Sequence, residues 1–482
     1  ASNFTNDVLA SGTGRSGNIS LEATNGSITL IGRGEQGEQN ENKVISTYNT
    51  NRGQGAGNVS LIANKGSISL DNAYITASSI SRINGGGEIL LQGDESVSLA
   101  NNSSLVATSF VSGNSGNITL RSSGPISVQS SLVSTNVGST ANFVSPQGNA
   151  GNINISGRSV SITDGSQVRS ESALGGNSGN IEINATDTVE ISGRLPVSLI
   201  GKSRGGFTFT RLLTSAGGNA TGKAGDININ VPSGTLRVAD GGNLRAETQA
   251  AFPGGNINVN AKVVELTGGG KVRTTTSSSG DAGNITFNNT DRITISGNIS
   301  GFNEILNEVQ NKDRRQAQNI RNEGYSDPSG VYANTSRTSR GKGGNVEITT
   351  GKLQVQDSGQ INVSSDGQGN AGSLKITANS IFLDTQGKLQ AATASGEGGN
   401  INLNVRDYIL MRRQSQISAA ARNNAKGGNI TISSPNGFVI AVNNENSDIV
   451  ATADQGQGGE ITITSSGVYG FETSPFVTRS QT

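Results

Sequence analysis

The side chains that could do chemistry in this sequence are carboxylates and guanidinium groups. The chain contains no histidine and no cysteine, which excludes Ser/His/Asp and Cys/His nucleophilic centres and thiolate metal sites. Aspartates could instead ligate calcium beside an arginine base, as in enzymes that cleave acidic polysaccharides. The candidates are Asp164, Asp187, Asp226, Asp281 and Asp291.

The elements that would position these side chains come from an internal repeat. A tripeptide of Gly, then Asn, Asp, Ser or Glu, then Ile, Val or Leu marks 14 anchor positions, and nine of the 13 spacings between successive anchors lie between 27 and 31 residues. A fixed period of this length indicates one structural unit repeated along the chain. The anchor tripeptides begin at Gly17, Gly57, Gly87, Gly116, Gly151, Gly179, Gly225, Gly255, Gly283, Gly344, Gly372, Gly399, Gly428 and Gly459.

Each unit contains three short stretches in which apolar and polar residues alternate. In one unit Ile153 and Ile155 alternate with asparagine, Val160 and Ile162 alternate with serine, and Val168 marks the third stretch. A period of two is typical of strands that direct alternate side chains into a core. Three strands and three turns per unit of about 28 residues predict an all-β fold, a single right-handed parallel β-helix of about fourteen rungs. We expect one continuous domain over residues 1–482, a rod roughly 65 Å long.

The composition fits a thin rod better than several globular cores. Glycine accounts for 68 of 482 residues, hydrophobic residues for 32% and aromatic residues for only 4%, which leaves little large apolar volume. The formal net charge is zero, so nucleic-acid binding and an electrostatic membrane anchor are not favoured. Residue 1 does not begin a signal peptide, so an export signal would have been removed or would lie upstream.

The glycine and the asparagine of the anchor have separate predicted roles. Glycine is expected where a corner needs a positive φ or where two backbones approach closely. Asparagine is either a simple turn residue or the member of a ladder that shares amide hydrogen bonds with its counterpart in the adjacent rungs.

The repeat weakens the case for catalysis or metal binding. The five aspartates fall at different positions of the unit, and Asp226 and Asp281 lie at turns, where aspartate is common. The glycines resemble those of the calcium-binding repeat G-G-x-G-x-D-x-U-x, but the aspartate register is missing. We therefore expect no enzymatic activity, no metal and no cofactor.

Four units are enlarged by insertions, at residues 31–42, 136–148, 193–206 and 297–329. In the largest, the segment from Asn303 to Gly324 leaves the β pattern, and some of its apolar residues could share one helical face. Two interpretations stay open: a lateral or ligand contact, or a tolerated surface insertion. The residues of the predicted contact are Ile305, Val309, Arg314, Arg315 and Ile320.

The repeat text resembles a known family. The segments "GNAGNINISGRSVSITDGSQVRSES" and "SGNIEINATDTVEISG", and the ending "SSGVYGFETSPFVTRSQT", are similar to filamentous-haemagglutinin-type exoproteins, particularly cyanobacterial ones. The resemblance implies a right-handed β-helix exported by two-partner secretion through an outer-membrane barrel, outside or on the surface of a Gram-negative-type bacterium. The N-terminal secretion domain of the family is missing from this chain, and no catalytic or ligand residue carries over.

The two ends of the sequence predict how copies could meet. Residues 6–18 align with residues 270–284, so the chain is expected to open in a third strand that lacks the first two. Residues 465–482 follow the first strand of the final unit and are expected to form either an inter-subunit contact or an apolar cap. Head-to-tail stacking would complete a rung from two copies, whereas the alternative is a fragment of a longer chain. The predicted inter-subunit residues are Val8, Leu9, Ile461, Ile463, Val468, Tyr469, Phe471 and Phe476.

These observations favour a secreted structural protein that forms surface fibres. The alternative is a cell-surface adhesin that binds a glycan or protein through its insertions, and a polysaccharide-cleaving enzyme is the least favoured. The expected partners are other copies of the chain, the secretion barrel during export and a surface polysaccharide, with no nucleic acid among them.

Overall fold

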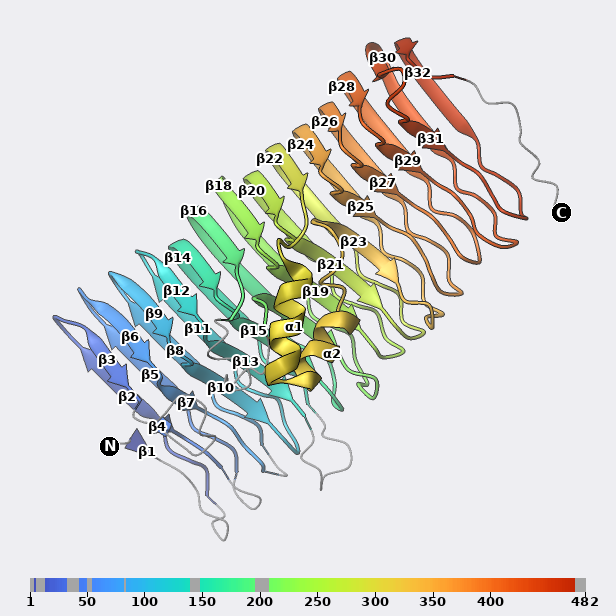
Figure 1. The fold of residues 1–482 in the computed structure, drawn as a ribbon. Helices are drawn as coiled ribbons and strands as arrows, with labels where there is room; N and C mark the ends of the chain where they lie inside the picture. The colour runs from blue at the N-terminus through green and yellow to red at the C-terminus, as the bar shows by residue number, and fades with distance from the viewer. Residues whose placement is uncertain are drawn as a thin grey trace.

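The chain winds into one elongated β-solenoid of about 13 turns, with about 30 residues per turn (Figure 1). The predicted β-helix is therefore confirmed. None of the described helices is long and apolar enough to cross a membrane. The computed structural model describes residues 4–5, 14–32, 43–49, 54–81, 84–138, 148–195 and 208–472.

One parallel sheet, sheet A, consists of the third strand of each turn. Every inner strand pairs with its equivalents in the turns before and after it, and a register shift occurs only between β4 and β7 among the described strands. The described strands of sheet A are β1 (Phe4–Thr5), β4 (Lys43–Ser46), β7 (Tyr74–Thr76), β10 (Ser104–Ser109), β13 (Leu132–Val137), β15 (Gln167–Ser172), β17 (Arg211–Ala216), β19 (Asn243–Thr248), β21 (Lys271–Thr276), β23 (Gly330–Thr335), β25 (Gln360–Asn362), β27 (Lys388–Gln390), β29 (Gln416–Ser418) and β31 (Asp448–Val450).

A second parallel sheet, sheet B, contains the first and second strands of each turn. In the first four turns these strands are separate, as predicted. They are β2 (Ile19–Ala23), β3 (Ile28–Ile31), β5 (Val59–Ala63), β6 (Ser67–Asp71), β8 (Ile89–Gly93), β9 (Ser96–Ala100), β11 (Ile118–Ser122) and β12 (Ile126–Gln129).

From residue 153 onward the first and second strands run together, so these turns have two strands instead of the predicted three. Register shifts such as the one between Gly157 and Ser159 bend the long strand at the corner, because a bulge turns a strand without ending its pairing. The long strands are β14 (Ile153–Thr163), β16 (Ile181–Ser192), β18 (Ile227–Ala239), β20 (Ile257–Thr267), β22 (Ile285–Ser296), β24 (Val346–Gln356), β26 (Leu374–Leu383), β28 (Ile401–Met411), β30 (Ile430–Ala441) and β32 (Ile461–Tyr469).

The anchor tripeptide sets the register of sheet B. Its apolar residue pairs with the apolar residue of the next anchor at every step, from Ile19 with Val59 to Ile430 with Ile461. Apart from Ile461 on the last strand, these side chains contribute to one continuous core of Ile, Val, Leu and Ala. Each large aliphatic side chain buried in this way contributes about 1.5–3 kcal/mol.

Close stacking of the turns explains the anchor glycines. A Cβ atom on Gly283 would lie 1.8 Å from the carbonyl oxygen of Gly255, and one on Gly255 would lie 1.8 Å from that of Gly225. Positive φ values occur at other glycines, for example 78° at Gly165 before sheet A and 80° and 149° at Gly113 and Gly148 before sheet B. The two predicted reasons for glycine therefore apply to different glycines.

The predicted asparagine ladder is present, but it uses the backbone. The N–H of Asn180 donates to Oδ1 of Asn152 over 2.8 Å, and the N–H of Asp226 donates to Oδ1 of Asn180 over 2.8 Å. This bond joins 11 of the 13 steps between the 14 anchors. The two steps without it start from Glu88 and Ser373, whose side chains differ from Asn and Asp.

The largest insertion forms the two helices α1 (Phe302–Lys312) and α2 (Arg314–Asn322), which confirms the predicted helical segment. Asp313 separates them with extended backbone, and its carboxylate accepts hydrogen bonds from the N–H groups of Arg315 and Gln316, which caps α2. The predicted insertions at 31–42, 136–148 and 193–206 fall largely outside the described residues.

Candidate functional site

The helical insertion is held on the rod by a small apolar core of its own. The rings of Phe209 and Tyr325 stack there with their centroids 4.5 Å apart. Ile305 and Val309 lie on α1 and Ile320 lies on α2, so the prediction that the three share one helical face is wrong. All three side chains are nevertheless buried in the same small core. Their prediction as ligand contacts is corrected, because enclosed side chains cannot reach a partner. The core consists of Leu195, Phe209, Ile299, Ile305, Val309, Ala317, Ile320 and Tyr325.

Arg314 and Arg315, at the start of α2, are exposed. Their role as lateral or ligand contacts stays a prediction. The insertion thus combines buried apolar residues, which pack against Leu195 and Phe209 of the rod, with exposed polar ones.

Beside the small core, arginines from neighbouring strands of sheet A meet a carboxylate of the insertion. Nη1 of Arg211 lies 3.1 Å from Oε2 of Glu323, and Nη1 of Arg245 donates to the same oxygen over 2.9 Å. Arg245 also binds Glu247 within its own strand, over 2.6 Å. The two guanidinium groups are only 4% and 9% exposed, so Glu323 neutralises charges that water hardly reaches.

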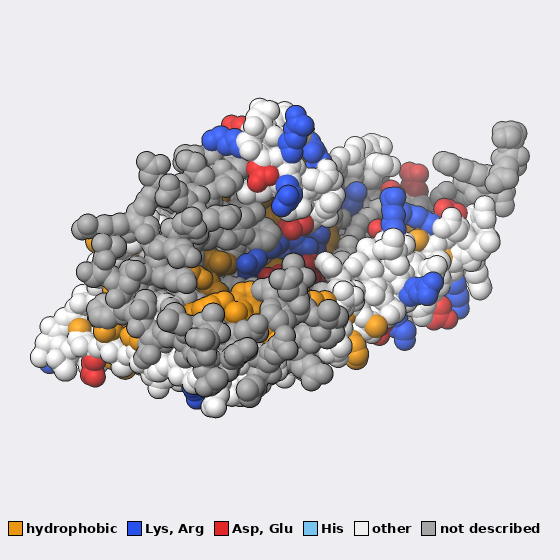
Figure 2. Space-filling model, turned by 90° about the horizontal axis from the view of Figure 1, so that it is seen from below, with side chains coloured by type: hydrophobic (Ala, Val, Ile, Leu, Met, Phe, Trp, Pro, Cys, Tyr) orange, Lys and Arg blue, Asp and Glu red, His pale blue; other side chains and the backbone are white. Residues whose placement is uncertain are grey.

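A third arginine extends this arrangement by one strand. Arg273 is the register partner of Arg245. It donates to Oδ2 of Asp327 over 2.5 Å and to the carbonyl oxygen of Glu323 over 3.2 Å, and its guanidinium lies 4.8 Å from the ring centroid of Tyr332. We call the set the guanidinium cluster: Arg211, Arg245, Arg273, Glu247, Glu323 and Asp327. Figure 2 shows basic and acidic side chains gathered in the hollow beneath the insertion.

Lys271 lies within the same region and is fully buried. Its Nζ donates to the carbonyl oxygens of Gly269 and Tyr325, over 3.0 and 3.3 Å. Burial, followed by the positive charge of Arg273, lowers the pKa of Lys271 from 10.5 to about 7. The guanidinium cluster already balances three positive charges with three negative ones, so a neutral Lys271 avoids an excess buried charge. The enclosed amine positions the insertion and offers no nucleophile to solvent.

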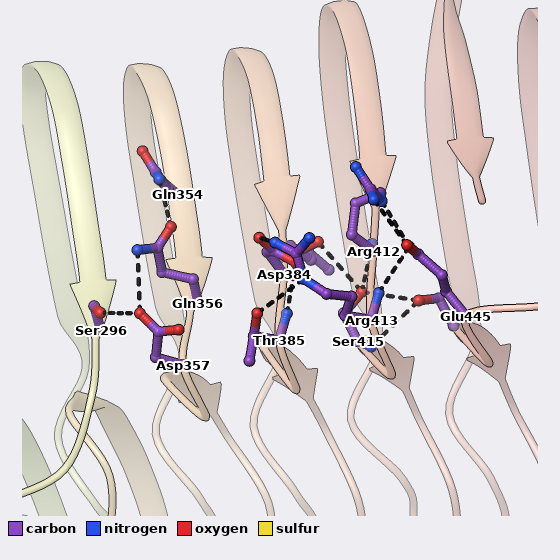
Figure 3. A network of polar contacts seen from close by, with 12 residues as sticks. Ser296, Gln354, Gln356, Asp357, Asp384, Thr385, Arg412, Arg413, Ser415 and Glu445 are labelled. Atoms are coloured by element: carbon purple, nitrogen blue, oxygen red, sulfur yellow. Dashed lines mark hydrogen bonds and ion pairs between the residues drawn. The ribbon is translucent and has the colours of Figure 1, made fainter.

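A second charged network lies at a corner of the last turns (Figure 3). Arg412 binds Glu445 through two hydrogen bonds of 2.6 and 2.7 Å. Arg413 pairs with Asp384 and donates to the hydroxyl of Thr385 over 3.2 Å. The hydrogen bond from Arg412 lowers the pKa of Glu445 to about 2. These pairs connect three successive turns at one corner. We call them the corner network.

The five aspartates considered for calcium binding are not brought together. Asp226 and Asp281 accept hydrogen bonds from backbone N–H groups of the next turn, over 2.7 and 2.8 Å. Asp164 binds the side chain of Gln129, and Asp187 pairs with Arg158 at 3.9 Å. No group of three or more His, Cys, Asp or Glu residues among the described ones could hold a metal ion.

The predicted end contacts fall into three groups. Ile461, Val468 and Tyr469 on β32 are 41%, 47% and 55% exposed. Ile463 and Phe471 are half-buried and pack against the main core. Val8, Leu9 and Phe476 lie outside the described residues, and the described strand that begins the chain is Phe4–Thr5. The role of all these residues in contacts between copies stays a prediction.

The sequence reasoning missed the guanidinium cluster. Aligning the third strands of consecutive units would have placed Arg245 and Arg273 in one column, because parallel pairing keeps equivalent residues in register. The partner Glu323 follows α2 within the insertion and is 112 residues away from Arg211, so the repeat pattern carries no signal for it.

Comparison of the chain with family models, curated proteins and solved structures gives no match. A β-helix occurs both in structural proteins and in enzymes, so the fold alone does not select a function. The function has to be inferred from the two ends of the rod and from its outer faces.

Proposed function

We propose that this chain is a secreted structural protein that builds fibres at the cell surface by stacking its rods end to end. The observation that carries the proposal is the uncovered core at β32. Ile461 and Val468 occupy columns whose preceding members, Ile430 and Val439, are fully buried. On β32 the same columns are 41% and 47% exposed, which leaves apolar area for another strand to cover.

The backbone edges support the same contact. β32 pairs with β30 on one side, and no described strand pairs with its other edge. At the opposite end of the rod (Figure 1), the described strands leave one edge of β2 and of β3 unpaired. Because all strands of sheet B run parallel, placing β2 and β3 of one copy on β32 of another continues the same ladder. A head-to-tail contact of this kind repeats without closing and generates a filament.

The lateral pairing gives such a fibre its persistence. Each inner turn is hydrogen-bonded to two neighbours through both sheets, and the asparagine ladder adds a bond at most steps. Local opening therefore has to break pairing with both neighbours at once. The location outside the cell, and export through an outer-membrane barrel, rest on the resemblance of the repeat to filamentous-haemagglutinin-type exoproteins.

Charge placed on the uncovered core tests the proposal. Sedimentation velocity of the wild-type chain is expected to show species that lengthen with protein concentration, and the double variant Ile461→Lys/Val468→Lys should remain a single rod. The matched control is Thr462→Lys/Thr464→Lys, which adds the same charge to the outer face of the same strand and should still lengthen. A wild-type chain of constant mass, or two double variants that behave alike, contradicts the proposal.

A further inference from the structure

The outer face of sheet B changes character in the last four turns. One outward column holds polar residues on six successive long strands, namely Ser161, Glu190, Arg237, Glu265, Thr294 and Gln354. The same column then continues with Phe382, Leu410, Ile440 and Tyr469. The inward neighbours stay apolar throughout, so the change affects only the solvent side.

The adjacent outward column adds two aromatic side chains. Tyr408 and Phe438 are register partners and are 37% and 41% exposed. The ring of Phe438 lies 6.1 Å from that of Tyr469. We call the six residues of both columns the outer apolar patch: Phe382, Tyr408, Leu410, Phe438, Ile440 and Tyr469.

The outer apolar patch does not serve the internal packing of the rod. Apart from Val263, the long strands of earlier turns place serine, threonine, glutamine or charged residues at the same positions and keep the same fold, and three of the six side chains of the patch remain strongly exposed. A contiguous apolar patch on an otherwise polar surface marks an interaction site.

The size of the patch argues against a second protein as its occupant. Four strands about 4.8 Å apart, with two outward residues on each, cover on the order of 100–200 Å². A stable interface between two proteins buries about 800 Å² on each partner. An area this small fits an extended chain of a few sugar rings.

The charges at the margins indicate that the occupant is neutral. Arg406 binds Asp407 through two hydrogen bonds at one margin, and Arg412 binds Glu445 in the same way at the other. Each of these two arginines is paired with its own carboxylate, so the pairs add no net positive charge that would favour an anionic polysaccharide. The paired groups keep free donor and acceptor positions for hydroxyl groups.

We infer that the outer apolar patch binds a neutral polysaccharide that runs along the rod. The apolar faces of successive sugar rings pack on Tyr408, Phe438 and Tyr469, and hydroxyl groups reach the two charged margins. The distance between adjacent turns is comparable with the length of one sugar residue in an extended chain, so one ring meets one turn. The site shares Tyr469 on β32 with the end-to-end contact proposed above, whereas Tyr408 and Phe438 lie on the inner strands β28 and β30.

An array of printed neutral and acidic polysaccharides tests this site. The full chain is compared with the double variant Tyr408→Ser/Phe438→Ser. Serine is chosen because Ser380, the register partner of Tyr408 on the preceding strand, holds this position there. The control is Phe252→Ser, because Phe252 is an equally exposed aromatic residue, at 43%, on a distant turn. Binding to a neutral polysaccharide should fall at least tenfold in the double variant, remain unchanged in the control and return in Tyr408→Trp/Phe438→Trp.

Three results would overturn the inference. The first is that no neutral polysaccharide on the array retains the wild-type chain, or that acidic ones retain it equally well. The second is that the double variant changes the sedimentation of the chain without changing polysaccharide binding, which identifies the patch as a contact between copies. The third is that the double variant loses thermal stability and polysaccharide binding together while Tyr408→Trp/Phe438→Trp restores only the stability, which identifies the patch as internal packing.

Discussion

The guanidinium cluster and the corner network both pair arginines with carboxylates, but in different surroundings. In the cluster, Arg211 and Arg245 are 4% and 9% exposed and share Glu323. At the corner, Arg412 is 31% exposed and binds Glu445 with comparable geometry. Hydrogen-bond distances therefore do not distinguish the two regions, whereas the exposure of the guanidinium groups does, since Arg412 and Arg413 are 31% and 51% exposed.

The comparison shows how a repeat protein carries an element that does not repeat. The corner network connects equivalent positions of successive turns, so it reinforces contacts that the strands already make. The cluster connects three turns to an insertion that has no place in the repeat. Breaking a buried pair leaves an uncompensated charge, whereas an exposed pair is replaced by water. The cluster should therefore dominate the stability of the insertion.

The largest expected effect follows from removing the shared carboxylate. Glu323→Gln leaves Arg211 and Arg245 buried without their common counter-charge, which should destabilise the docked insertion by about 3–5 kcal/mol. Hydrogen exchange of α1 and α2 measures this opening directly. The matched control is Glu308→Gln in the same insertion, because Glu308 is half-exposed and lies 3.8 Å from Arg194. Equal protection in the two variants would show that the cluster does not hold the insertion.

The second effect is a pH dependence centred on Lys271. Its pKa is about 7 in the folded chain and 10.5 when solvated. Between these values the unfolded chain binds a proton that the folded chain lacks, so the free energy of unfolding rises as the pH increases from 7 to 10.5.

Lys271→Met should remove this rise and stabilise the protein at pH 7 by on the order of a few kcal/mol. Urea unfolding at pH 7 and pH 10 measures both changes. Lys375→Met, at an exposed pair with Glu347, should keep the wild-type pH dependence. If the free energy of unfolding of Lys271→Met still rises between pH 7 and pH 10, another group causes the pH dependence.

The third effect is smaller and belongs to the corner network. The pKa of Glu445 is about 2, against an ordinary value of 4.5, so its stabilising contribution is complete above pH 4.5 and is lost as the pH falls towards 2. Glu445→Gln should remove this acid-dependent step from the last turns only. Hydrogen exchange of β29 and β31 at pH 3 and pH 6 detects it, and Glu460→Gln, on the exposed end of the rod, is the control. A change that spreads to β17 or β19 would contradict the local role of the network.

The smallest effect tests the asparagine ladder, which runs along the rod between the anchors of successive turns. Ser373 is one of the two anchor positions that start a step without a ladder bond. Ser373→Asn should supply an acceptor for the N–H of Asn400 and stabilise the chain by about 0.5–1.5 kcal/mol. Thermal unfolding measures the gain, and Ser373→Ala should show none. If Ser373→Asn unfolds at the same temperature as Ser373→Ala, the ladder bond adds no stability and asparagine serves at the anchor only as a turn residue.

The sequence predicts those features that recur and misses those that connect different parts of the chain. The spacing of the anchors predicts the solenoid, because each apolar anchor residue must meet its equivalent on the next turn. The periodicity around Ile305, Val309 and Ile320 predicts helical structure, but it reveals neither the break at Asp313 that puts Ile320 on a second helix nor the surface on which these residues pack. The bulges that join first and second strands depend on corner geometry, which the composition of segments such as Ser156–Arg158 does not reveal.

Electron microscopy of the purified chain tests the proposed end-to-end stacking most directly. Stacking of rods with about 13 turns predicts unbranched filaments of uniform width, whose length grows with protein concentration and whose subunit repeat is roughly 60–65 Å. Particles that keep the length of one rod at every concentration would contradict it.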